Sequence, residues 1–195
     1  MSMQPVKALK VLLKAIQDDW IVVTNQGSAR IWPKIAQRPL DLHYNPSTMG
    51  GAVPLAVGLA LAQPEREVIC VTGDGALLMS LGSLVTAAAC NASNLTIVVL
   101  NNGLYEVTGG QRTPGHFAKV DFCGLAVSAG DVFHYDIHHL AQWEAEVGKV
   151  LGKSDSPRFV CLHVEPTPRE YLEFPTPLMA EQLERFRAAL SRAAS

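Results

Sequence analysis

The sequence predicts an α/β fold, with a three-layer, doubly wound and mostly parallel sheet that carries helices on both faces. The main observation is a pair of short apolar runs, 68–72 and 95–100, which are rich in β-branched residues and end in turn formers. Between them, segment 76–91 carries apolar residues at helical spacing. A strand, a helix and a strand of this length form a right-handed crossover, so both strands are parallel and end at one edge of the sheet.

The same alternation of short apolar runs and helical spacing extends along the rest of the chain. Further helices are expected at 4–18, 29–37, 50–63, 121–130, 138–152 and 179–194. Further strands are expected at 20–24, 131–136 and 158–164. Segments 41–49 and 105–119 are expected to be irregular, and 171–177 to be an extended arm. Pro33 must lie within the first turn of its helix.

Composition favours one globular domain spanning residues 1–195 and argues against several classes of partner. Hydrophobic residues make up 48% of the chain and charged residues only 17%, a surplus that suggests a buried subunit face. A net charge of −2 provides no basic surface for nucleic acid or an anionic membrane. No apolar run reaches the length of a membrane span, and the N-terminal segment lacks a signal-peptide pattern, so a cytoplasmic protein is expected.

Cysteine and histidine residues offer no contiguous metal motif. The four cysteines lie in apolar surroundings without a C-x-x-C pair: Cys70, Cys90, Cys123 and Cys161. This spacing disfavours a zinc site or an iron–sulfur cluster and favours small buried thiols. Four histidines near the last strands are interpreted as structural: His134, His138, His139 and His163.

Polar side chains follow both strands of the central unit. Asp74 comes directly after the first strand, between Gly73 and Gly75, and the Asn101-Asn102 pair follows the second. Parallel strands end at the same edge, where open α/β sheets bind ligands. A carboxylate and an amide oxygen are ligands that Mg²⁺ accepts when phosphate oxygens complete its shell. The start of the following helix favours a diphosphate, although a plain turn with Asp74 as helix N-cap is the alternative.

Gly-Asp-Gly, then 25 residues, then Asn-Asn resemble the signature of thiamine diphosphate enzymes. The resemblance implies thiamine diphosphate and Mg²⁺ as cofactors, with Asp74, Asn102 and the main-chain carbonyl of Leu104 as metal ligands. Gly75 and Ala76 would contact the diphosphate. The cofactor-binding residues that the resemblance implies are Gly27, Ser28, Ser47, Met49, Gly73, Asp74, Gly75, Ala76, Asn102, Leu104 and Tyr105.

Two loops that precede helices add to the expected cofactor site. In thiamine diphosphate enzymes the loop after the first strand reaches towards the cofactor, which makes Gly27 and Ser28 candidates; Ser28 as a helix cap is the alternative, and both can hold. Met49 stands where these enzymes carry a bulky apolar residue that props the cofactor into its bent conformation. The main-chain carbonyl of Ser47 would receive the cofactor's 4′-amino group. His43, upstream, either faces the site or is an exposed loop histidine.

The segment TGGQRT, residues 108–113, resembles most closely the sulfopyruvate and phosphonopyruvate decarboxylases. Arg112 has planar paired donors that suit sulfonate or phosphonate oxygens; a solvated loop arginine is the alternative. In the pyruvate decarboxylase branch this segment supplies a catalytic glutamate. Counted from Asn102, Thr108 holds that place, and Glu106 should point differently. The candidate catalytic residues are therefore Met49, Arg112 and Thr108.

The resemblance implies a thiamine diphosphate-dependent carboxy-lyase that decarboxylates a 2-oxo acid. Resembling enzymes activate the cofactor with a glutamate from a pyrimidine-binding domain, whose pattern this sequence does not show. The chain is therefore expected to be a diphosphate-binding subunit, similar to the β subunit of sulfopyruvate decarboxylases, in a hetero-oligomer with a pyrimidine-domain α subunit. An acetolactate synthase-like carboligase subunit and a non-catalytic cofactor-binding or assembly module are the alternatives. The 2-oxo acid, the partner and the stoichiometry stay open.

Overall fold

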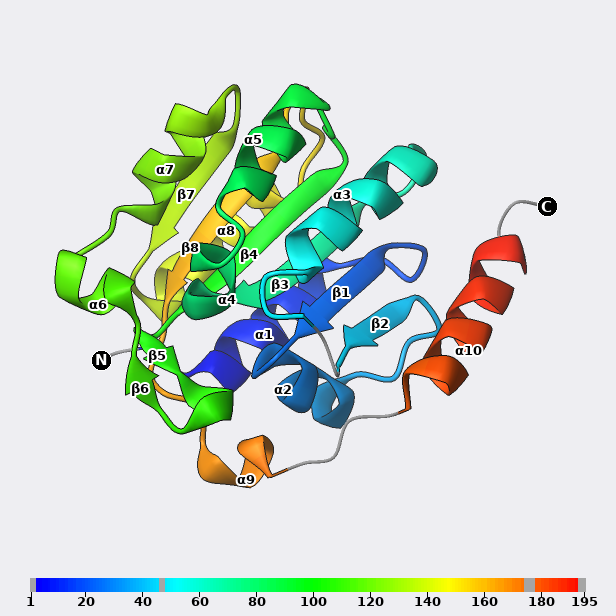
Figure 1. Ribbon diagram of the computed structural model, residues 1–195. Coiled ribbons are helices and arrows are strands. Elements are labelled where there is room, and N and C mark those ends of the chain that lie inside the picture. The colour runs from blue at the N-terminus through cyan, green and yellow to red at the C-terminus, as the bar shows by residue number, and fades with distance from the viewer. Residues whose placement is uncertain (1–2, 46–47, 174–177, 193–195) are drawn as a thin grey trace.

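The computed structural model describes residues 3–45, 48–173 and 178–192. A six-stranded sheet lies between two layers of helices, which confirms the predicted three-layer α/β fold (Figure 1). Its strands, in chain order, are β1 (Ile21–Asn25), β2 (Asp41–Tyr44), β3 (Val68–Gly73), β4 (Leu95–Asn101), β7 (Phe133–Ile137) and β8 (Arg158–His163). They lie in the order β2-β1-β3-β4-β8-β7, and every neighbouring pair is parallel.

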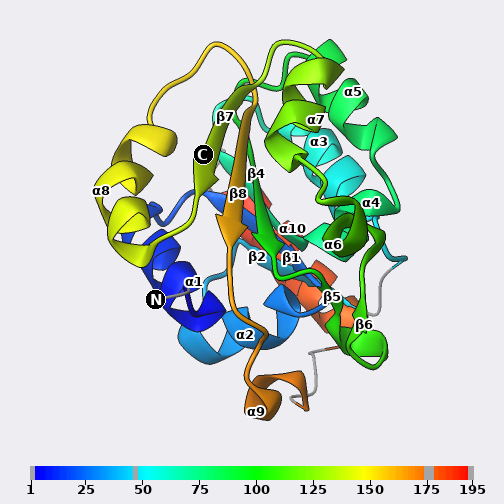
Figure 2. The ribbon, with the colours of Figure 1, turned by 90° about the vertical axis from the view of Figure 1, so that its left-hand side faces the viewer.

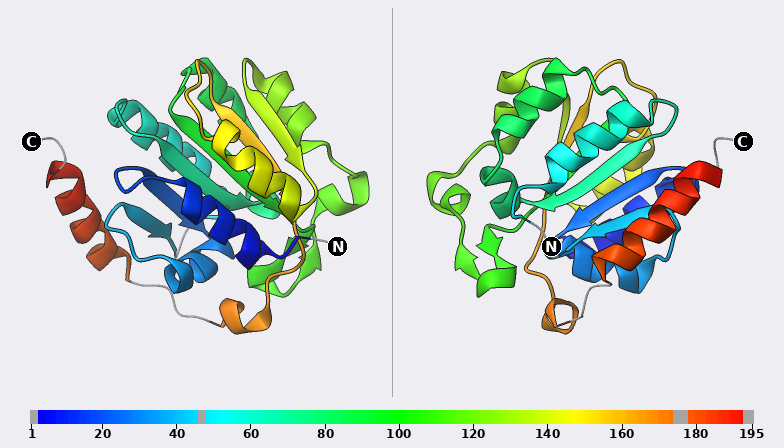
Figure 3. Two further views of the ribbon diagram at one scale, coloured as in Figure 1. Left: turned by 180° about the vertical axis from the view of Figure 1, so that it is seen from behind. Right: turned by 45° about the vertical axis from the view of Figure 1, so that its right-hand side comes forward.

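Helices cover both faces of this sheet (Figures 2 and 3). One face carries α1 (Pro5–Ala15), α2 (Ser28–Ile35) and α8 (Leu140–Val150). The other carries α3 (Ala52–Ala62), α4 (Asp74–Leu78), α5 (Gly82–Ala89) and α7 (Phe122–Ala129). α10 (Met179–Arg192) lies beside the edge strand β2, and the short α9 (Arg169–Leu172) contacts α2.

The core has two parts, one on each face of the sheet. Alternate residues of a strand point to opposite faces, so Ile97 and Val99 of β4 belong to one cluster and Val98 and Leu100 to the other. Strands buried on both faces read as continuous apolar runs, which is why segments 68–72 and 95–100 could be recognised as strands. This rigid centre positions the carboxyl ends of β1, β3 and β4 beside one another.

Segment 41–49 contains a strand, contrary to the expectation that it is irregular. β2 pairs in parallel with β1, and Asp41 within it is only 1% exposed. The strand tolerates this carboxylate because Trp32 Nε1 donates a hydrogen bond to it at 2.8 Å and Arg38 forms an ion pair with it at 3.0 Å. Both partners lie outside segment 41–49, so the residues of this segment alone do not indicate a strand.

The single helix predicted at 76–91 is in fact two helices, α4 and α5, separated at residues 79–81. Between the two helices, the backbone carbonyl of Ser80 accepts two hydrogen bonds from Ser83. One comes from the Ser83 N–H at 2.8 Å and the other from its hydroxyl at 2.6 Å. Gly50 packs closely here, because a Cβ at that position would lie 3.0 Å from the Ser80 side chain. Local side-chain hydrogen bonds of this kind compete with a continuous helix.

Segment 105–119 is also more ordered than predicted. It contributes to a two-stranded antiparallel hairpin of β5 (Leu104–Tyr105) and β6 (Gln111–Arg112), followed by α6 (Pro114–Ala118). The turn between β5 and β6 uses Gly109 and Gly110, whose φ angles of 123° and 76° suit glycine.

Two smaller expectations are wrong. Pro33 lies in the second turn of α2, because the helix begins at Ser28 rather than at residue 29 or later. The proposed extended arm 171–177 begins inside α9, and residues 174–177 lie outside the described part of the chain.

Candidate functional site

A pocket lies at the carboxyl ends of β1, β3 and β4. Strand β1 is flanked by β2 on one side and β3 on the other, so the direction of chain progression reverses there. Ligands of open α/β sheets bind at such a switch point. The pocket lining includes these expected cofactor residues: Gly27, Ser28, Met49, Gly73, Asp74, Gly75, Ala76, Asn102, Leu104 and Tyr105. The remaining expected residue, Ser47, lies outside the described residues.

Asp74 is the most informative residue of the pocket. It begins α4 and is 1% exposed, and its Oδ2 accepts a hydrogen bond from the Thr113 hydroxyl at 2.9 Å. Its Oδ1 is buried and has no hydrogen-bond partner within the described part of the chain. Burial raises the pKa of Asp74, whereas the Thr113 hydroxyl and the N–H groups of Gly75 and Asn102 act to lower it. A buried carboxylate oxygen without a partner is costly, and a bound cation would satisfy it.

Asn102 supplies the second expected metal ligand. Its backbone N–H interacts with the Asp74 carboxylate, so the ends of β3 and β4 meet at one point. Its side-chain Oδ1 accepts the N–H of Leu104 at 2.9 Å and keeps a second lone pair. A carboxylate oxygen and an amide oxygen form a hard donor set that fits Mg²⁺.

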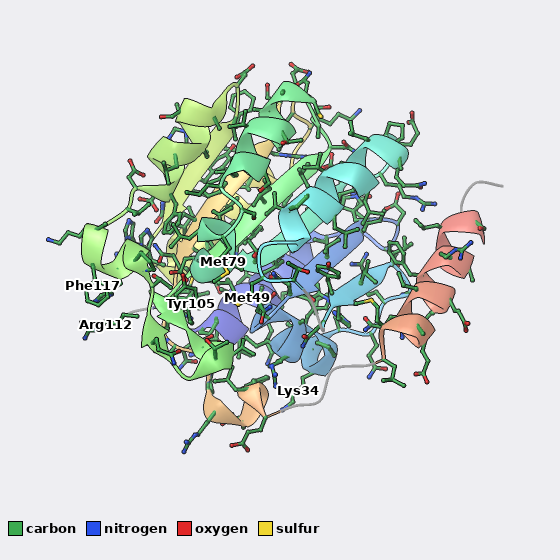
Figure 4. The ribbon with its side chains drawn as sticks, in the orientation of Figure 1. Lys34, Met49, Met79, Tyr105, Arg112 and Phe117 are labelled. Atoms are coloured by element: carbon green, nitrogen blue, oxygen red, sulfur yellow. The ribbon has the colours of Figure 1, made fainter. Side chains whose placement is uncertain are left out.

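The start of α4 requires glycine at position 75. A Cβ there would lie 2.5 Å from the ring of Tyr105 and 3.1 Å from the methyl group of Thr113. The hairpin therefore packs directly on the first turn of this helix, and Tyr105 and Met49, which both line the pocket, are labelled next to each other in Figure 4. Gly75 and Ala76 stand in that first turn, where helical N–H groups have no intrahelical partner.

Two residues of the pocket region have roles that sequence reasoning missed. Thr113 is fully buried, and its hydroxyl donates a hydrogen bond to Asp74. The Glu106 carboxylate lines the pocket and accepts hydrogen bonds from the N–H and the hydroxyl of Thr167, the latter at 2.8 Å. It also lies beside Gly27, where a Cβ would be 3.1 Å from Glu106 Oε2. These contacts join distant parts of the chain, and no local motif signals them.

The candidate catalytic residues differ in their placement. Met49 and Thr108 both line the pocket. The Thr108 hydroxyl is exposed and lies 3.4 Å from the Tyr105 carbonyl. Arg112 is exposed, is not among the pocket-lining residues, and lies at the periphery near Phe117 (Figure 4). The structure thus does not bring Arg112 to the pocket of this chain.

Ser28 lines the pocket where β1 ends, and Asn25 is the last residue of that strand. The hydroxyl of Ser28 lies 2.7 Å from the carbonyl oxygen of Asn25 and 2.8 Å from that of Val71, so it can donate its one proton to either and links β1 to β3. Gly27 is the N-cap of α2, so Ser28 does not hold that position. The amide side chain of Asn25 is buried, and neither of its polar atoms has a hydrogen-bond partner among the described residues.

His43 neither faces the pocket nor lies exposed in a loop. It is 3% exposed on β2, and its ring lies 2.9 Å from the Thr24 hydroxyl. Its backbone N–H donates to Gln182 Oε1 of α10 at 2.9 Å. Burial, helped by the nearby charge of Arg185, lowers the pKa of His43 to about 4.

This parallel sheet, with a pocket at its switch point that contains a buried carboxylate, defines a doubly wound α/β protein. Residues 25–164 match the family described as thiamine pyrophosphate enzyme, C-terminal TPP binding domain, and the chain belongs to that family.

Relatives and solved structures agree with this assignment. The chain is 36% identical over 188 residues to a phosphonopyruvate decarboxylase of Streptomyces viridochromogenes, which covers 94% of this chain and 45% of the relative. It is 35% identical over 130 residues to sulfopyruvate decarboxylase subunit beta of Methanothermobacter thermautotrophicus, with 67% and 68% covered. A 4-hydroxybenzoylformate decarboxylase of Rhodococcus jostii has the same fold, with a TM-score of 0.69 at 23% identity, covering 84% of this chain and 33% of that one.

The chain spans less than half of the phosphonopyruvate decarboxylase that it matches. Among the described residues, none of the helices is both long enough and apolar enough to cross a membrane.

Proposed function

We propose that this chain is the diphosphate-binding subunit of a thiamine diphosphate- and Mg²⁺-dependent 2-oxo acid decarboxylase. The observation that carries the proposal is the buried, unpartnered Oδ1 of Asp74, which lies beside Asn102 at the switch point of the sheet. The match to the thiamine pyrophosphate-binding family supports the choice of cofactor. Similarity to phosphonopyruvate and sulfopyruvate decarboxylases supports an anionic 2-oxo acid as substrate.

Each pocket residue has a role in this proposal. Asp74, Asn102 and the carbonyl of Leu104 hold the metal ion, and Gly75 and Ala76 receive the diphosphate. When bound, thiamine diphosphate supplies an electron sink for the carbanion that remains after the carboxylate leaves as CO₂.

The other residues orient these groups or exclude water. Thr113 fixes the rotamer of Asp74 through its hydrogen bond, and Met49 forms the apolar support beneath the cofactor. Thr108 stands at the mouth of the pocket, in the place where pyruvate decarboxylase relatives carry a glutamate. Arg112 would receive the sulfonate or phosphonate group once partner and substrate close the site.

A separate α subunit with a pyrimidine-binding domain completes the proposed cytoplasmic hetero-oligomer. The similarity to a protein named as subunit beta supports this arrangement. Exposed apolar side chains in the helical layer of α3, α4, α5 and α7 support it as well: Leu61 is 53% exposed, Met79 52%, Val85 54% and Val127 47%. Residues 1–195 would then form a single diphosphate-binding domain.

Calorimetric titration with thiamine diphosphate and Mg²⁺, with and without the partner chain, tests the proposal. We expect Mg²⁺-dependent binding that tightens when the partner is present. Absence of any cofactor binding by the complex would reject the proposed function and leave only the fold assignment.

An acetolactate synthase-like carboligase is the second candidate, because the chain is 29% identical over 150 residues to the catabolic acetolactate synthase of Raoultella terrigena. Product analysis with several 2-oxo acids separates the two. Aldehyde products indicate decarboxylation, and hydroxyketones indicate ligation.

Arg112→Ala should raise KM for a sulfonated or phosphonated 2-oxo acid far more than KM for pyruvate. An equal rise for both substrates would remove Arg112 from substrate recognition.

A further inference from the structure

A second polar cluster lies at the same edge of the sheet, where β7 and β8 end. Asp136 lies on β7 and His138 directly follows the end of that strand, whereas Cys161 and His163 are two residues apart along β8. Asp136 and Cys161 are register partners in the parallel ladder. Because residues i and i+2 of a strand share a face, the register brings the side chains of Asp136, Cys161 and His163 together on one side of the sheet.

The distances within this cluster are short. His163 Nε2 lies 2.7 Å from Asp136 Oδ1, and His138 Nε2 lies 3.2 Å from Asp136 Oδ2. Cys161 Sγ lies 3.7 Å from His163 Nε2. The two imidazole rings are stacked, with centroids 3.9 Å apart. One carboxylate oxygen, one sulfur and one imidazole nitrogen therefore lie within 4.8 Å of one another, and the His138 ring lies beside this group, stacked on His163.

We propose that Asp136, His138, Cys161 and His163 form a binding site for a zinc-class transition-metal ion. Zinc–ligand bonds of about 2.0–2.3 Å in a tetrahedron place neighbouring ligand atoms roughly 3.3–3.8 Å apart. The Cys161–His163 distance already matches this edge, and the His138–Asp136 distance is close to it. The Asp136–His163 pair has to lengthen by roughly 0.6 Å, and the exposed His138 side chain has to rotate towards the other three ligands to become the fourth.

The chemistry of the four groups favours a metal over a purely hydrogen-bonded cluster. Two stacked imidazoles that share one carboxylate would repel each other if both were protonated, whereas a metal ion binds both as neutral ligands. Burial raises the pKa of the Cys161 thiol, so metal binding has to displace its proton to water, as in other thiolate sites. The Asn101 side-chain amide donates towards Cys161 Sγ at 3.7 Å and can stabilise the resulting thiolate.

Four protein ligands make a closed, structural site rather than a catalytic one. It would fasten the exposed edge strand β7 to β8. It would also fix one wall of a hollow of about 640 Å³ whose lining includes His138, His163 and Asn102. The site is therefore distinct from the proposed magnesium site, yet next to it.

Cobalt spectroscopy on the full protein tests this inference, with excess Mg²⁺ present to saturate hard oxygen sites. We expect one equivalent of Co²⁺ to give the intense visible bands of a four-coordinate ion and a thiolate-to-cobalt band in the near ultraviolet, both lost when Zn²⁺ is added. Cys161→Ser should abolish the thiolate band. His138→Ala should weaken binding by at least about tenfold, and its side chain is 53% exposed, so the fold should survive.

Matched variants provide the controls. His134→Ala on the same strand, Cys123→Ser at the nearest other buried thiol, and Asp74→Ala at the proposed magnesium site should leave the cobalt spectrum unchanged. Zn²⁺ should raise the Tm of the wild-type protein and not that of His138→Ala. A thiolate band that survives in Cys161→Ser, or a weak six-coordinate spectrum in the wild type, would overturn the assignment.

Discussion

Two polar clusters share the carboxyl edge of this sheet, and they are built differently. The cluster at β3 and β4 centres on Asp74, which is 1% exposed, and follows directly from short motifs at two strand ends. The cluster at β7 and β8 centres on Asp136, whose side chain is 47% exposed, and exists only through the pairing of two strands. The residues of the central cluster can thus be found from short motifs in the sequence. Those of the edge cluster are brought together only by the pairing of β7 with β8.

The largest effect that separates the two clusters concerns cofactor binding. Asp74→Ala should abolish Mg²⁺-dependent binding of thiamine diphosphate, because the only charged ligand of the proposed site is removed. Asp136→Ala should leave that binding intact. Calorimetry on both variants makes the comparison, and loss of binding in both, or in neither, would break the distinction between the clusters.

A buried histidine at the opposite edge of the sheet, His43, should make stability depend on pH. The folded pKa of His43 is about 4, below its ordinary value of 6.5, so the unfolded chain binds an extra proton between these values. The stabilisation is present above pH 6.5 and is lost as pH falls towards 4, and it amounts to on the order of 3 kcal/mol. Denaturant unfolding across this range should show a flatter profile for His43→Asn. If the free energy of unfolding changed with pH equally in His43→Asn and in the wild type, His43 would not be the cause. His134→Ala, at an exposed histidine, serves as the control.

The central cluster should also be the more tightly packed. Gly75→Ala places a Cβ against the Tyr105 ring and should lower the free energy of unfolding by about 1–3 kcal/mol. Gly58→Ala, inside α3 with no atom near the added Cβ, should instead stabilise by about 0.5–1 kcal/mol. Urea unfolding measures both, and partial recovery in Gly75→Ala combined with Tyr105→Ala would identify the clash.

The smallest expected effect concerns the support of Asp74. Thr113→Val keeps the shape of a buried side chain but removes its hydrogen bond, so Mg²⁺ affinity should fall by about tenfold. Thr108→Val, at an exposed neighbour, should leave Mg²⁺ affinity unchanged. Equal effects from the two variants would show that the Thr113 hydroxyl does not orient the metal ligand.

The sequence could predict the features that depend on residues close together along the chain. The β3–β4 unit and the polar residues at its ends were accessible because each strand is a continuous apolar run with its functional residue next to it. Most other pocket-lining residues were expected only through the resemblance to thiamine diphosphate enzymes. Strand β2 was not accessible, because the partners that make a buried Asp41 tolerable lie at Trp32 and Arg38. The break between α4 and α5 depends on hydrogen bonds of Ser83, which helical spacing does not reveal.

Contacts between distant segments were equally hidden. The bonds of Thr113 to Asp74 and of Glu106 to Thr167 bring together residues far apart along the chain. A zinc site was disfavoured because the sequence contains no C-x-x-C pair, which is a motif of ligands close together along the chain. The edge cluster instead takes its residues from β7, the position just after it, and β8, and only the pairing of these strands brings them together.

The most direct test is a crystal structure of the chain with its partner, thiamine diphosphate and Mn²⁺ in place of Mg²⁺. The anomalous signal of manganese locates the ion without ambiguity. A peak within bonding distance of Asp74 Oδ1 and Asn102 Oδ1, next to the diphosphate, is the result we expect. A bound cofactor whose metal ion lies away from Asp74 would contradict the proposed site.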